Sequence, residues 1–469
     1  MDKKEKLFAA LEAEYRARTP KSLALHRRAG ASMIKGGSHN LRLWRPYPFF
    51  MAGASGAEVE DVDGHLYIDY WQGHYANILG HDPAVLRPLP QPDDFSHLRP
   101  SLHSGFEGES QVRLAETILD AVGYDDYKIR FTTSGTLAAM YAVMLALAHT
   151  GRDRVLKIGG GWHGASPFLL KGVKFHPGAG YDAADSAGIP QAALDCVDVV
   201  PFNDEERLER IIREKGDRIG CFILEPVLGA GGCLPAAPSY LRLARRLTEE
   251  RGIVLVFDEI ISGFRFAPAP VHTLYGVKPD LATLGKIIGG GHAVAAVAGR
   301  ADILDGCGAQ APEPRRVLFE GGTFSAHPLY MRAGAAMIEY LKANASSVYP
   351  RLAAVGDRLR RGIAAAFRSE GIETFLTGGV NEAIPGSSLF MVHFPRVPFI
   401  PTKAEDLADP ALVDAGLREE TLKLFVCLRG LHIVHGGGAA SFAHTDAHID
   451  KTLEAYAEAA AVFKKSLFS

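Results

Sequence analysis

The chain has 469 residues, of which 47% are hydrophobic and 22% charged, and its formal net charge is −3. These values are typical of a globular enzyme, and the chain is too long for one small hydrophobic core. No basic cluster suggests a nucleic-acid partner, and no run of about 18 apolar residues predicts a membrane span.

The N-terminal end and the cysteines favour the cytoplasm. Residues 1–6 are mostly charged and lack the apolar stretch of a signal peptide. The five cysteines are scattered without CxxC spacing, which favours reduced thiols over a disulfide framework.

The pattern of apolar residues predicts the elements in chain order. A polar helix is expected over residues 3–18, followed by a loop rich in glycine, arginine and aromatic residues. Seven strands, alternating with helices, are then expected at residues 129–131, 155–158, 198–201, 221–224, 254–257, 281–284 and 293–298. This alternation predicts one doubly wound, mostly parallel sheet.

The C-terminal part shows a different pattern. A long helix follows Leu329, and a glycine-rich region, a strand near 388–392 and a final helix from Asp446 come after it. This succession predicts a smaller α+β domain. Two proline-rich pieces, 88–92 and 395–410, are expected to be short loops.

Small hydroxyl residues follow the first of the seven strands. Residues 132–136 read Thr-Thr-Ser-Gly-Thr and precede an apolar helix over 137–150. Free backbone N–H groups and the positive end of the helix dipole at such a terminus suit a phosphate. Ordinary N-capping explains the same residues equally well.

A glycine-flanked aromatic residue follows the second strand. Trp162 lies in Gly160-Gly-Trp-His-Gly164, where its ring is placed to stack on a flat heterocycle. The alternative is a plain core residue.

A carboxylate ends the strand expected at 254–257. Residues 253–257 form a continuous apolar run, as in a parallel strand buried on both faces, and Asp258 follows directly. Such a position points into the crevice where α/β sheets bind ligands, so Asp258 could hold a cation such as a protonated ring nitrogen. A helix N-cap or a metal ligand is the alternative. Because no His or Cys lies nearby at ligand spacing, no metal site is predicted.

A lysine follows the sixth strand. Lys286 stands before a glycine-rich turn, Gly289-Gly290-Gly291, with no bulky side chain to crowd it. In a dry pocket a lysine loses its proton readily and forms an imine with a carbonyl. The alternative is an ordinary lysine that lies in a turn and faces solvent.

A ring, a phosphate cradle, a carboxylate and a lysine together describe a site for pyridoxal 5′-phosphate. The sequence resembles the class III (fold type I) aminotransferases, and within them the glutamate-1-semialdehyde 2,1-aminomutase-like group, which also contains β-amino-acid aminotransferases. The resemblance covers nearly the whole chain. Besides the motifs above, it is carried by the segments 64–70, 78–81, 225–226, 263–265, 279–281 and 322–323.

The resemblance implies an α/β architecture of fold type I, with helices on both faces of the seven-stranded sheet plus a smaller α+β domain. It divides the chain into an N-terminal segment, 1–69, that packs on the small domain, a large cofactor-binding domain, 70–335, and a small C-terminal domain, 336–469. It also implies a homodimer with shared active sites.

The resemblance further implies cofactor-binding roles for particular residues. Lys286 forms the imine with the cofactor aldehyde and later acts as the general base, and Asp258 keeps the pyridine nitrogen protonated. The remaining cofactor-binding residues are Ser134, Gly135 and Thr136 at the phosphate, Trp162 and Ile260 on the two ring faces, His163, and Thr323 from the second subunit.

Three residues are expected on the substrate side. Arg42 resembles the arginine that grips a substrate carboxylate, as suits a guanidinium fork, although a loop arginine facing water remains open. His74 stands where the aminomutases have a tryptophan, and Glu225 is expected in the active-site wall. His327 and His435 also depart from the aminomutase pattern, and both are expected to line the substrate side.

These departures favour an aminotransferase that moves an amino group from an amino acid or amine, possibly a β-amino acid, to a keto acid or aldehyde by a ping-pong mechanism. The alternative is glutamate-1-semialdehyde 2,1-aminomutase. A decarboxylase or racemase on the same scaffold, or a non-enzymatic sensor, also stays open.

Overall fold

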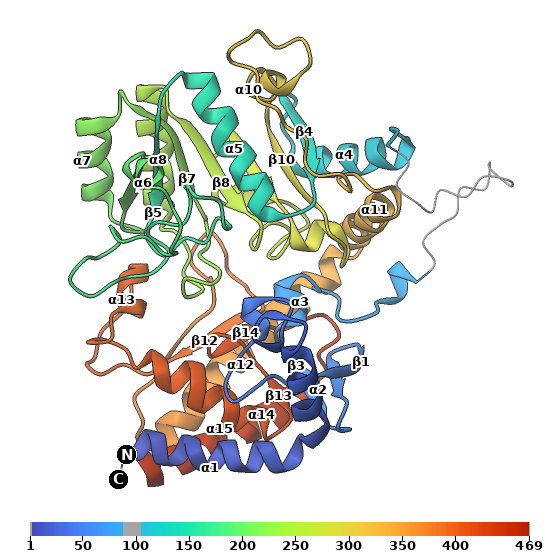
Figure 1. Ribbon diagram of the computed structural model, residues 1–469, viewed down its shortest axis with the longest axis vertical. Coiled ribbons are helices and arrows are strands. Elements are labelled where there is room, and N and C mark those ends of the chain that lie inside the picture. The colour runs from blue at the N-terminus through green and yellow to red at the C-terminus, as the bar shows by residue number, and fades with distance from the viewer. Residues whose placement is uncertain (1, 88–104, 469) are drawn as a thin grey trace, which may run out of the picture.

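The computed structural model describes residues 2–87 and 105–468 as two packed lobes (Figure 1). The upper lobe in Figure 1 holds the middle of the chain, and the lower lobe holds both ends, so that both termini lie at its base. The proline-rich piece 88–92 lies outside the described residues. The other, 395–410, contains the short helix α13 (Ala404–Ala408).

The upper lobe is built on one seven-stranded sheet with the strand order β4-β10-β9-β8-β7-β5-β6. Its strands are β4 (Tyr127–Thr132), β5 (Arg154–Ile158), β6 (Val197–Val200), β7 (Ile219–Leu224), β8 (Val254–Glu259), β9 (Leu281–Leu284) and β10 (Ala295–Arg300). Strand β10 is antiparallel to both of its neighbours, and the other paired strands are parallel. The predicted mostly parallel seven-stranded sheet is confirmed.

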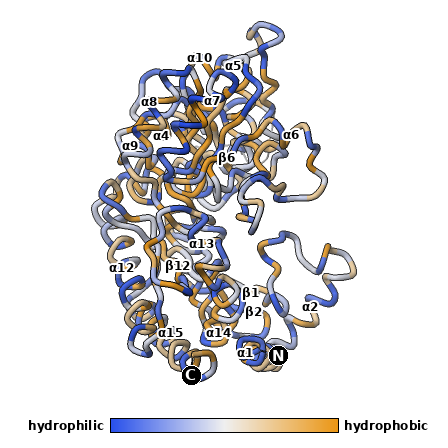
Figure 2. The backbone as a smooth tube through the Cα atoms, turned by 90° about the vertical axis from the view of Figure 1, so that its left-hand side faces the viewer, coloured by the Kyte–Doolittle hydropathy of each residue, from blue (hydrophilic) through white to orange (hydrophobic). Residues whose placement is uncertain are grey.

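Helices cover both faces of this sheet because successive side chains of a buried strand point to opposite faces. In β7, Phe222 and Leu224 join one core with the helices α7 and α8, whereas Cys221 and Ile223 join another under α5. The helices around the sheet are α4 (Glu109–Val122), α5 (Gly135–Thr150), α7 (Glu205–Lys215), α8 (Pro238–Arg251) and α11 (Pro328–Ala343). Figure 2 shows that hydrophobic residues concentrate inside this lobe.

The lower lobe contains two small sheets. The first pairs β1 (Met51–Ser55), β2 (Glu58–Asp61) and β3 (Leu66–Asp69) with the late strand β13 (Leu431–His432), and the second joins β11 (Phe375–Thr377), β12 (Leu389–His393) and β14 (Gly437–Ala439). Its long helices are α1 (Lys3–Arg18), α2 (Pro20–Gly30), α12 (Ala345–Ser369) and α15 (Asp446–Leu467), with the shorter α14 (Lys423–Cys427) beside them. The expected helix over 3–18 and the final helix from Asp446 are both observed.

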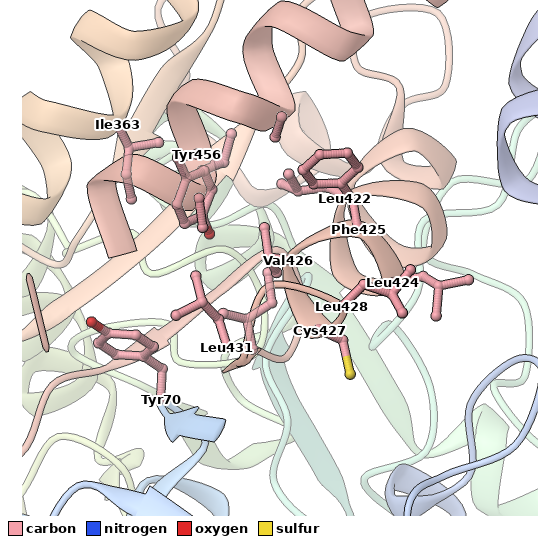
Figure 3. Packing of buried hydrophobic residues seen from close by; sticks show 14 of the residues in the cluster. Tyr70, Ile363, Leu422, Leu424, Phe425, Val426, Cys427, Leu428, Leu431 and Tyr456 are labelled. Carbon is pink, nitrogen blue, oxygen red and sulfur yellow. The ribbon is translucent and has the colours of Figure 1, made fainter. Parts of the chain in front are cut away.

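One hydrophobic core joins the two ends of the chain in this lobe. Figure 3 shows Tyr70 and Leu431, which are close in space although far apart in sequence, facing Ile363 of α12 and Tyr456 of α15. Phe8, Leu11 and Tyr15 of α1 belong to the same core, and α1 contacts α14 and α15. The first residues of the chain therefore pack against its last helices.

The remaining short elements are α3 (Gln72–Tyr75), α6 (Gln191–Asp195), α9 (His272–Tyr275), α10 (Ala301–Leu304), the 3-10 turns η1 (Ile34–Gly36), η2 (Asn40–Arg42), η3 (Ala84–Leu86), η4 (Lys286–Gly289) and η5 (Asp305–Cys307), and the π-helical segment η6 (Leu417–Leu422). In the part of the chain that the structure describes, no helix is both long and apolar enough to cross a membrane.

Candidate active site

Asp258 lies at the carboxyl end of β8, where the neighbouring strand and a loop fix both of its carboxylate oxygens. The β8–β9 register places Asp258 opposite Thr283, whose hydroxyl donates to Oδ1 at 2.9 Å. The backbone N–H of Ile260 donates to the same oxygen at 3.1 Å. Asp258 is 3% exposed. Its orientation therefore follows from the sheet itself.

His163 holds the second oxygen of Asp258. It follows β5 in the loop that also carries Trp162, and its Nδ1 lies 2.8 Å from Asp258 Oδ2. Burial lowers the pKa of His163, although Asp258 opposes this shift. A neutral imidazole that donates from Nδ1 would leave the charge of Asp258 available for a cation in the cavity.

Lys286 is the first residue after β9 and Gly285. Its φ is 48°, a left-handed conformation that costs a non-glycine residue about 1–2 kcal/mol, so the surrounding fold must hold it there. Burial lowers the pKa of Lys286 to about 8, while Asp258 and Glu225 partly oppose that shift. A lysine with such a pKa has a much larger neutral, nucleophilic fraction near neutral pH than an ordinary lysine.

The N-terminus of α5 forms a cradle for an anion. Ser134 caps the helix by accepting from the Leu137 N–H at 3.3 Å. Within the described residues the amides of Gly135 and Thr136 make no hydrogen bond, so both can point at a ligand. A Cβ at Gly164 would lie 2.5 Å from Thr136 Cα, so a larger residue there would push on the cradle.

Ile260 packs between two glycines beside this cradle. A Cβ added at Gly135 would meet the Ile260 side chain at 3.0 Å, and one added at Gly285 would meet it at 2.9 Å. Both positions thus leave just enough room for the branched side chain, which presents an apolar surface to the cavity. An anion cradle, an apolar floor, a fixed carboxylate and a lysine of lowered pKa fit pyridoxal 5′-phosphate.

Glu225 supports the loop that carries Trp162. Its Oε1 accepts from the Trp162 N–H at 2.8 Å, and its Oε2 accepts from the Gly229 N–H at 3.0 Å. Burial, with a smaller contribution from Asp258, raises the pKa of Glu225 to about 8. The Trp162 ring is 42% exposed, which makes it one surface of the cavity and not part of the core.

Most of the predicted site residues line one cavity of about 490 Å³. These residues are Arg42, His74, Ser134, Gly135, Thr136, Trp162, His163, Glu225, Asp258, Ile260 and Lys286. Thr323 does not line it. Thr323 is exposed, in a stretch where Leu318 and Phe324 are also exposed, at 64% and 61%.

The substrate side of the cavity is held more loosely than the cofactor side. Arg42 is exposed and donates to the Ser38 hydroxyl at 3.1 Å, and no ion pair to it exists within residues 2–87 and 105–468. The ring of His39 meets that of His74 edge to face at 5.1 Å. Burial, together with His39 and Arg42, lowers the pKa of His74 to about 4, so His74 is neutral at neutral pH.

A left-handed turn presents His74 to the cavity. All four residues of α3, from Gln72 to Tyr75, have φ between 46° and 68°. The turn is anchored at its start, where the Gln72 N–H donates to Asp69 Oδ2 at 3.0 Å. Strained backbone of this kind persists only where neighbouring contacts hold it, and it is typical of functional sites.

Sequence reasoning missed several residues of the site. Thr283 orients Asp258. It could have been found from the alternation of side chains along β9, because it faces the same side of the sheet as the position just before Lys286. His39 and His292 also line the cavity, but they lie on loops and carry no pattern. His327 stacks on Tyr330, and His435 lies 3.3 Å from Glu419; neither lines this cavity.

No group of three or more His, Cys, Asp or Glu side chains in the described ranges is arranged to hold a metal ion.

Comparison with known proteins identifies the family of the chain. A model of the family described as aminotransferase class-III matches residues 42–374, more than half of the chain. A glutamate-1-semialdehyde 2,1-aminomutase of Methanothermobacter thermautotrophicus is 36% identical over 443 residues, which cover 93% of this chain and 98% of that protein.

Solved structures show the same fold. An omega-transaminase from Sphaerobacter thermophilus superimposes with a TM-score of 0.82 at 30% identity, covering 95% of this chain and 98% of that one. A β-phenylalanine aminotransferase from Variovorax paradoxus gives 0.81 at 28% identity and 98% of both chains. A glutamate-1-semialdehyde aminomutase from Pseudomonas aeruginosa in complex with PMP gives 0.83 with 97% coverage of both, and at 20% identity it shows the fold alone.

Proposed function

We propose a function from one premise, that this chain belongs to the class III aminotransferases and is an enzyme dependent on pyridoxal 5′-phosphate. The proposal is that it transfers an amino group from an amino acid to a keto acid or aldehyde in two half-reactions. The observation that carries it is Arg42, which lines the same cavity as Lys286 and forms no ion pair with any residue of 2–87 and 105–468. A guanidinium without a carboxylate partner beside the reacting centre suits a donor with a carboxylate.

The bound cofactor supplies an electron sink for the bonds at the carbon that carries the amino group. In the proposal, Lys286 would bind the cofactor through its aldehyde and would move the proton at that carbon. Its lowered pKa of about 8 suits this role, because a general base works best near the operating pH. Asp258, oriented by His163 and Thr283, would keep the ring nitrogen protonated, and the amides of Gly135 and Thr136 would bind the phosphate.

The second candidate function is the aminomutase, and the names of the relatives favour it. The relatives at 32–36% identity are glutamate-1-semialdehyde 2,1-aminomutases. The similar structures at 26–30% identity are transaminases. We favour the transaminase because His74, which stands where the aminomutases have a tryptophan, lines the cavity as a neutral side chain against the ring of His39.

One experiment separates the two functions. Purified enzyme saturated with cofactor is incubated with amino donors and a separate 2-oxo acid, and both products are quantified. The proposal expects one acceptor-derived amino acid for each donor consumed. Efficient conversion of glutamate 1-semialdehyde to 5-aminolevulinate, without exchange with an outside acceptor, would establish the aminomutase instead.

We further propose a homodimer in which Thr323 reaches the phosphate of the neighbouring subunit. The support is its exposed position outside the cavity of its own chain, beside the exposed Phe324. Exposed apolar residues of this size gather at protein interfaces more often than at free surfaces.

A further inference from the structure

A second cavity of about 490 Å³ adjoins the candidate active site. Arg42, Gly73 and His74 line both cavities, so these three residues lie at the boundary between them. Gly73 contributes no side chain to this wall. The size lies within the range of roughly 300–1,000 Å³ that small-molecule pockets occupy.

The wall of this side cavity is mostly aromatic and aliphatic. Its apolar lining residues are Met33, Trp44, Pro48, Phe49, Phe50, Met51, Val59 and Trp71. Two of the three tryptophans of the chain are among them. Trp71 also packs against His74, with 4.2 Å between the ring centroids, so the aromatic wall continues up to the active site.

The acidic group in this cavity is already satisfied. Asp69 binds Nε2 of His81 at 2.9 Å and Nδ1 of His432 at 3.0 Å. It also accepts from the backbone N–H groups of Trp71 and Gln72. These contacts hold the pKa of Asp69 well below its usual range, and each oxygen is engaged twice. Asp69 therefore supports the wall and offers little to a ligand.

The charged group at the junction is Arg42. It lines both cavities and forms no ion pair within the described ranges. The neighbouring His74 is neutral at neutral pH, so Arg42 supplies the positive charge at this point of the wall. A carboxylate held here would lie between the lysine cavity and the aromatic cavity.

We infer that the side cavity binds the side chain of the amino donor, and that the donor is an amino acid with an aromatic or similarly large apolar side chain. This inference rests on the proposed aminotransferase function. The carboxylate binds Arg42, the amino group faces Lys286, and the side chain passes Gly73 into the ring-lined cavity. A short, polar compound such as glutamate 1-semialdehyde would leave these apolar walls in contact with water.

The first test measures binding without catalysis. Propanoate and 3-phenylpropanoate carry the carboxylate but no amino group, so neither can react. Calorimetric titration of the cofactor-loaded enzyme should show 3-phenylpropanoate binding about 10- to 100-fold more tightly, the factor expected for burying a phenyl group. Equal affinity for the two acids would overturn the inference.

A pair of variants locates the effect. Met33 lines the side cavity with an ordinary extended backbone (φ −121°), so Met33→Trp should fill part of the cavity without strain. The adjacent Ile34 is 86% exposed and does not line the cavity, which makes Ile34→Trp the matched control. Met33→Trp should remove most of the preference for 3-phenylpropanoate, and Ile34→Trp should keep it. The same loss in both variants, or in neither, would contradict the inference.

The second test uses matched donors with and without a phenyl group. Phenylalanine is compared with alanine, which has a hydrogen in place of the phenyl group, and 3-amino-3-phenylpropanoate with 3-aminobutanoate, which has a methyl group in its place. At least one pair should show kcat/KM about 10- to 100-fold higher for the phenyl member, and Met33→Trp should reduce that ratio. Equal use of both members overturns the inference and leaves the aminotransferase function intact. Absence of amino transfer from every donor overturns the proposed function, and the binding data still decide whether the cavity takes a ring.

Discussion

The two halves of the candidate active site are built in different ways. On the cofactor side, Asp258 and Glu225 follow buried strands, and both oxygens of each are held by hydrogen bonds. On the substrate side, Arg42 is exposed with one bond to Ser38, and His74 lies in a strained turn. In the proposed function, the sheet therefore positions the groups that would do the chemistry, whereas loops carry the residues that would select the substrate.

This difference makes the cofactor side intolerant of change. Lys157 in β5 illustrates it, because its buried ammonium donates to the carbonyls of Gly161 and Leu169 and so braces the loop that carries Trp162. Burial lowers the pKa of Lys157 to about 8. The substrate side has no comparable brace beneath Arg42 among the described residues, so substitutions there should alter specificity before they alter chemistry.

The largest effect is expected at Lys286. Lys286→Ala should abolish amino transfer and the visible absorbance of the lysine-bound cofactor, because no other group in the cavity can form that bond. The fold should persist, since the alanine removes a buried amine whose charged form is disfavoured there. Borohydride reduction of the wild-type enzyme, followed by peptide mapping, should label Lys286. Label on a different lysine would show that the assignment is wrong.

Asp258→Asn should reduce kcat at least ~100-fold with the fold unchanged. One unit of pKa corresponds to about 1.4 kcal/mol, and a close buried ion pair commonly shifts a pKa by more than one unit. The amide keeps the size of the side chain but removes the charge that holds a proton on the ring nitrogen. Circular dichroism controls for folding, and steady-state kinetics measure the loss. Near-normal turnover would mean that another group protonates the ring.

The cofactor side could be predicted because its residues follow strands whose apolar runs are visible in the sequence. Asp258 lies at the end of β8, Lys286 lies just after β9, and the segment 133–136 leads into α5. The Asp258–His163 contact could not be predicted, because it joins a strand end to a loop residue 95 positions away in the sequence. The same is true of β13, whose pairing with β3 depends on the tertiary fold.

For the substrate side, the sequence suggests residues but no shape. Arg42 and His74 both line the cavity, yet the left-handed turn of α3 follows from anchoring by Asp69, which no local pattern reveals. The aromatic side cavity draws its walls from residues 33–81 and from His432, so it exists only after the two ends of the chain have packed together.

Arg42→Ala should cost ~30- to 1000-fold in kcat/KM toward amino-acid donors. Removing one partner of a charged, bidentate hydrogen bond in a partly desolvated site costs roughly 2–4 kcal/mol. Simple amines without a carboxylate should lose little, so the ratio between the two donor classes is the quantity to measure. Arg42→Lys is the control, because it keeps the positive charge but lacks the planar guanidinium group that binds a carboxylate through two hydrogen bonds. A similar loss for both donor classes would place Arg42 outside carboxylate binding.

The smallest effect is expected at Thr323, which would contact the phosphate bound in the neighbouring subunit. Loss of one hydrogen bond to a phosphate with several other donors should weaken cofactor binding about 10-fold in Thr323→Ala, and Thr323→Ser should restore it. A ligand bound across an interface also stabilises the assembled state, so cofactor should tighten dimerisation of the wild type, and less so in Thr323→Ala. Sedimentation over a dilution series, with and without cofactor, measures both. An active monomer at every concentration would be incompatible with a shared site, and the exposure of Leu318 and Phe324 would then need a different partner.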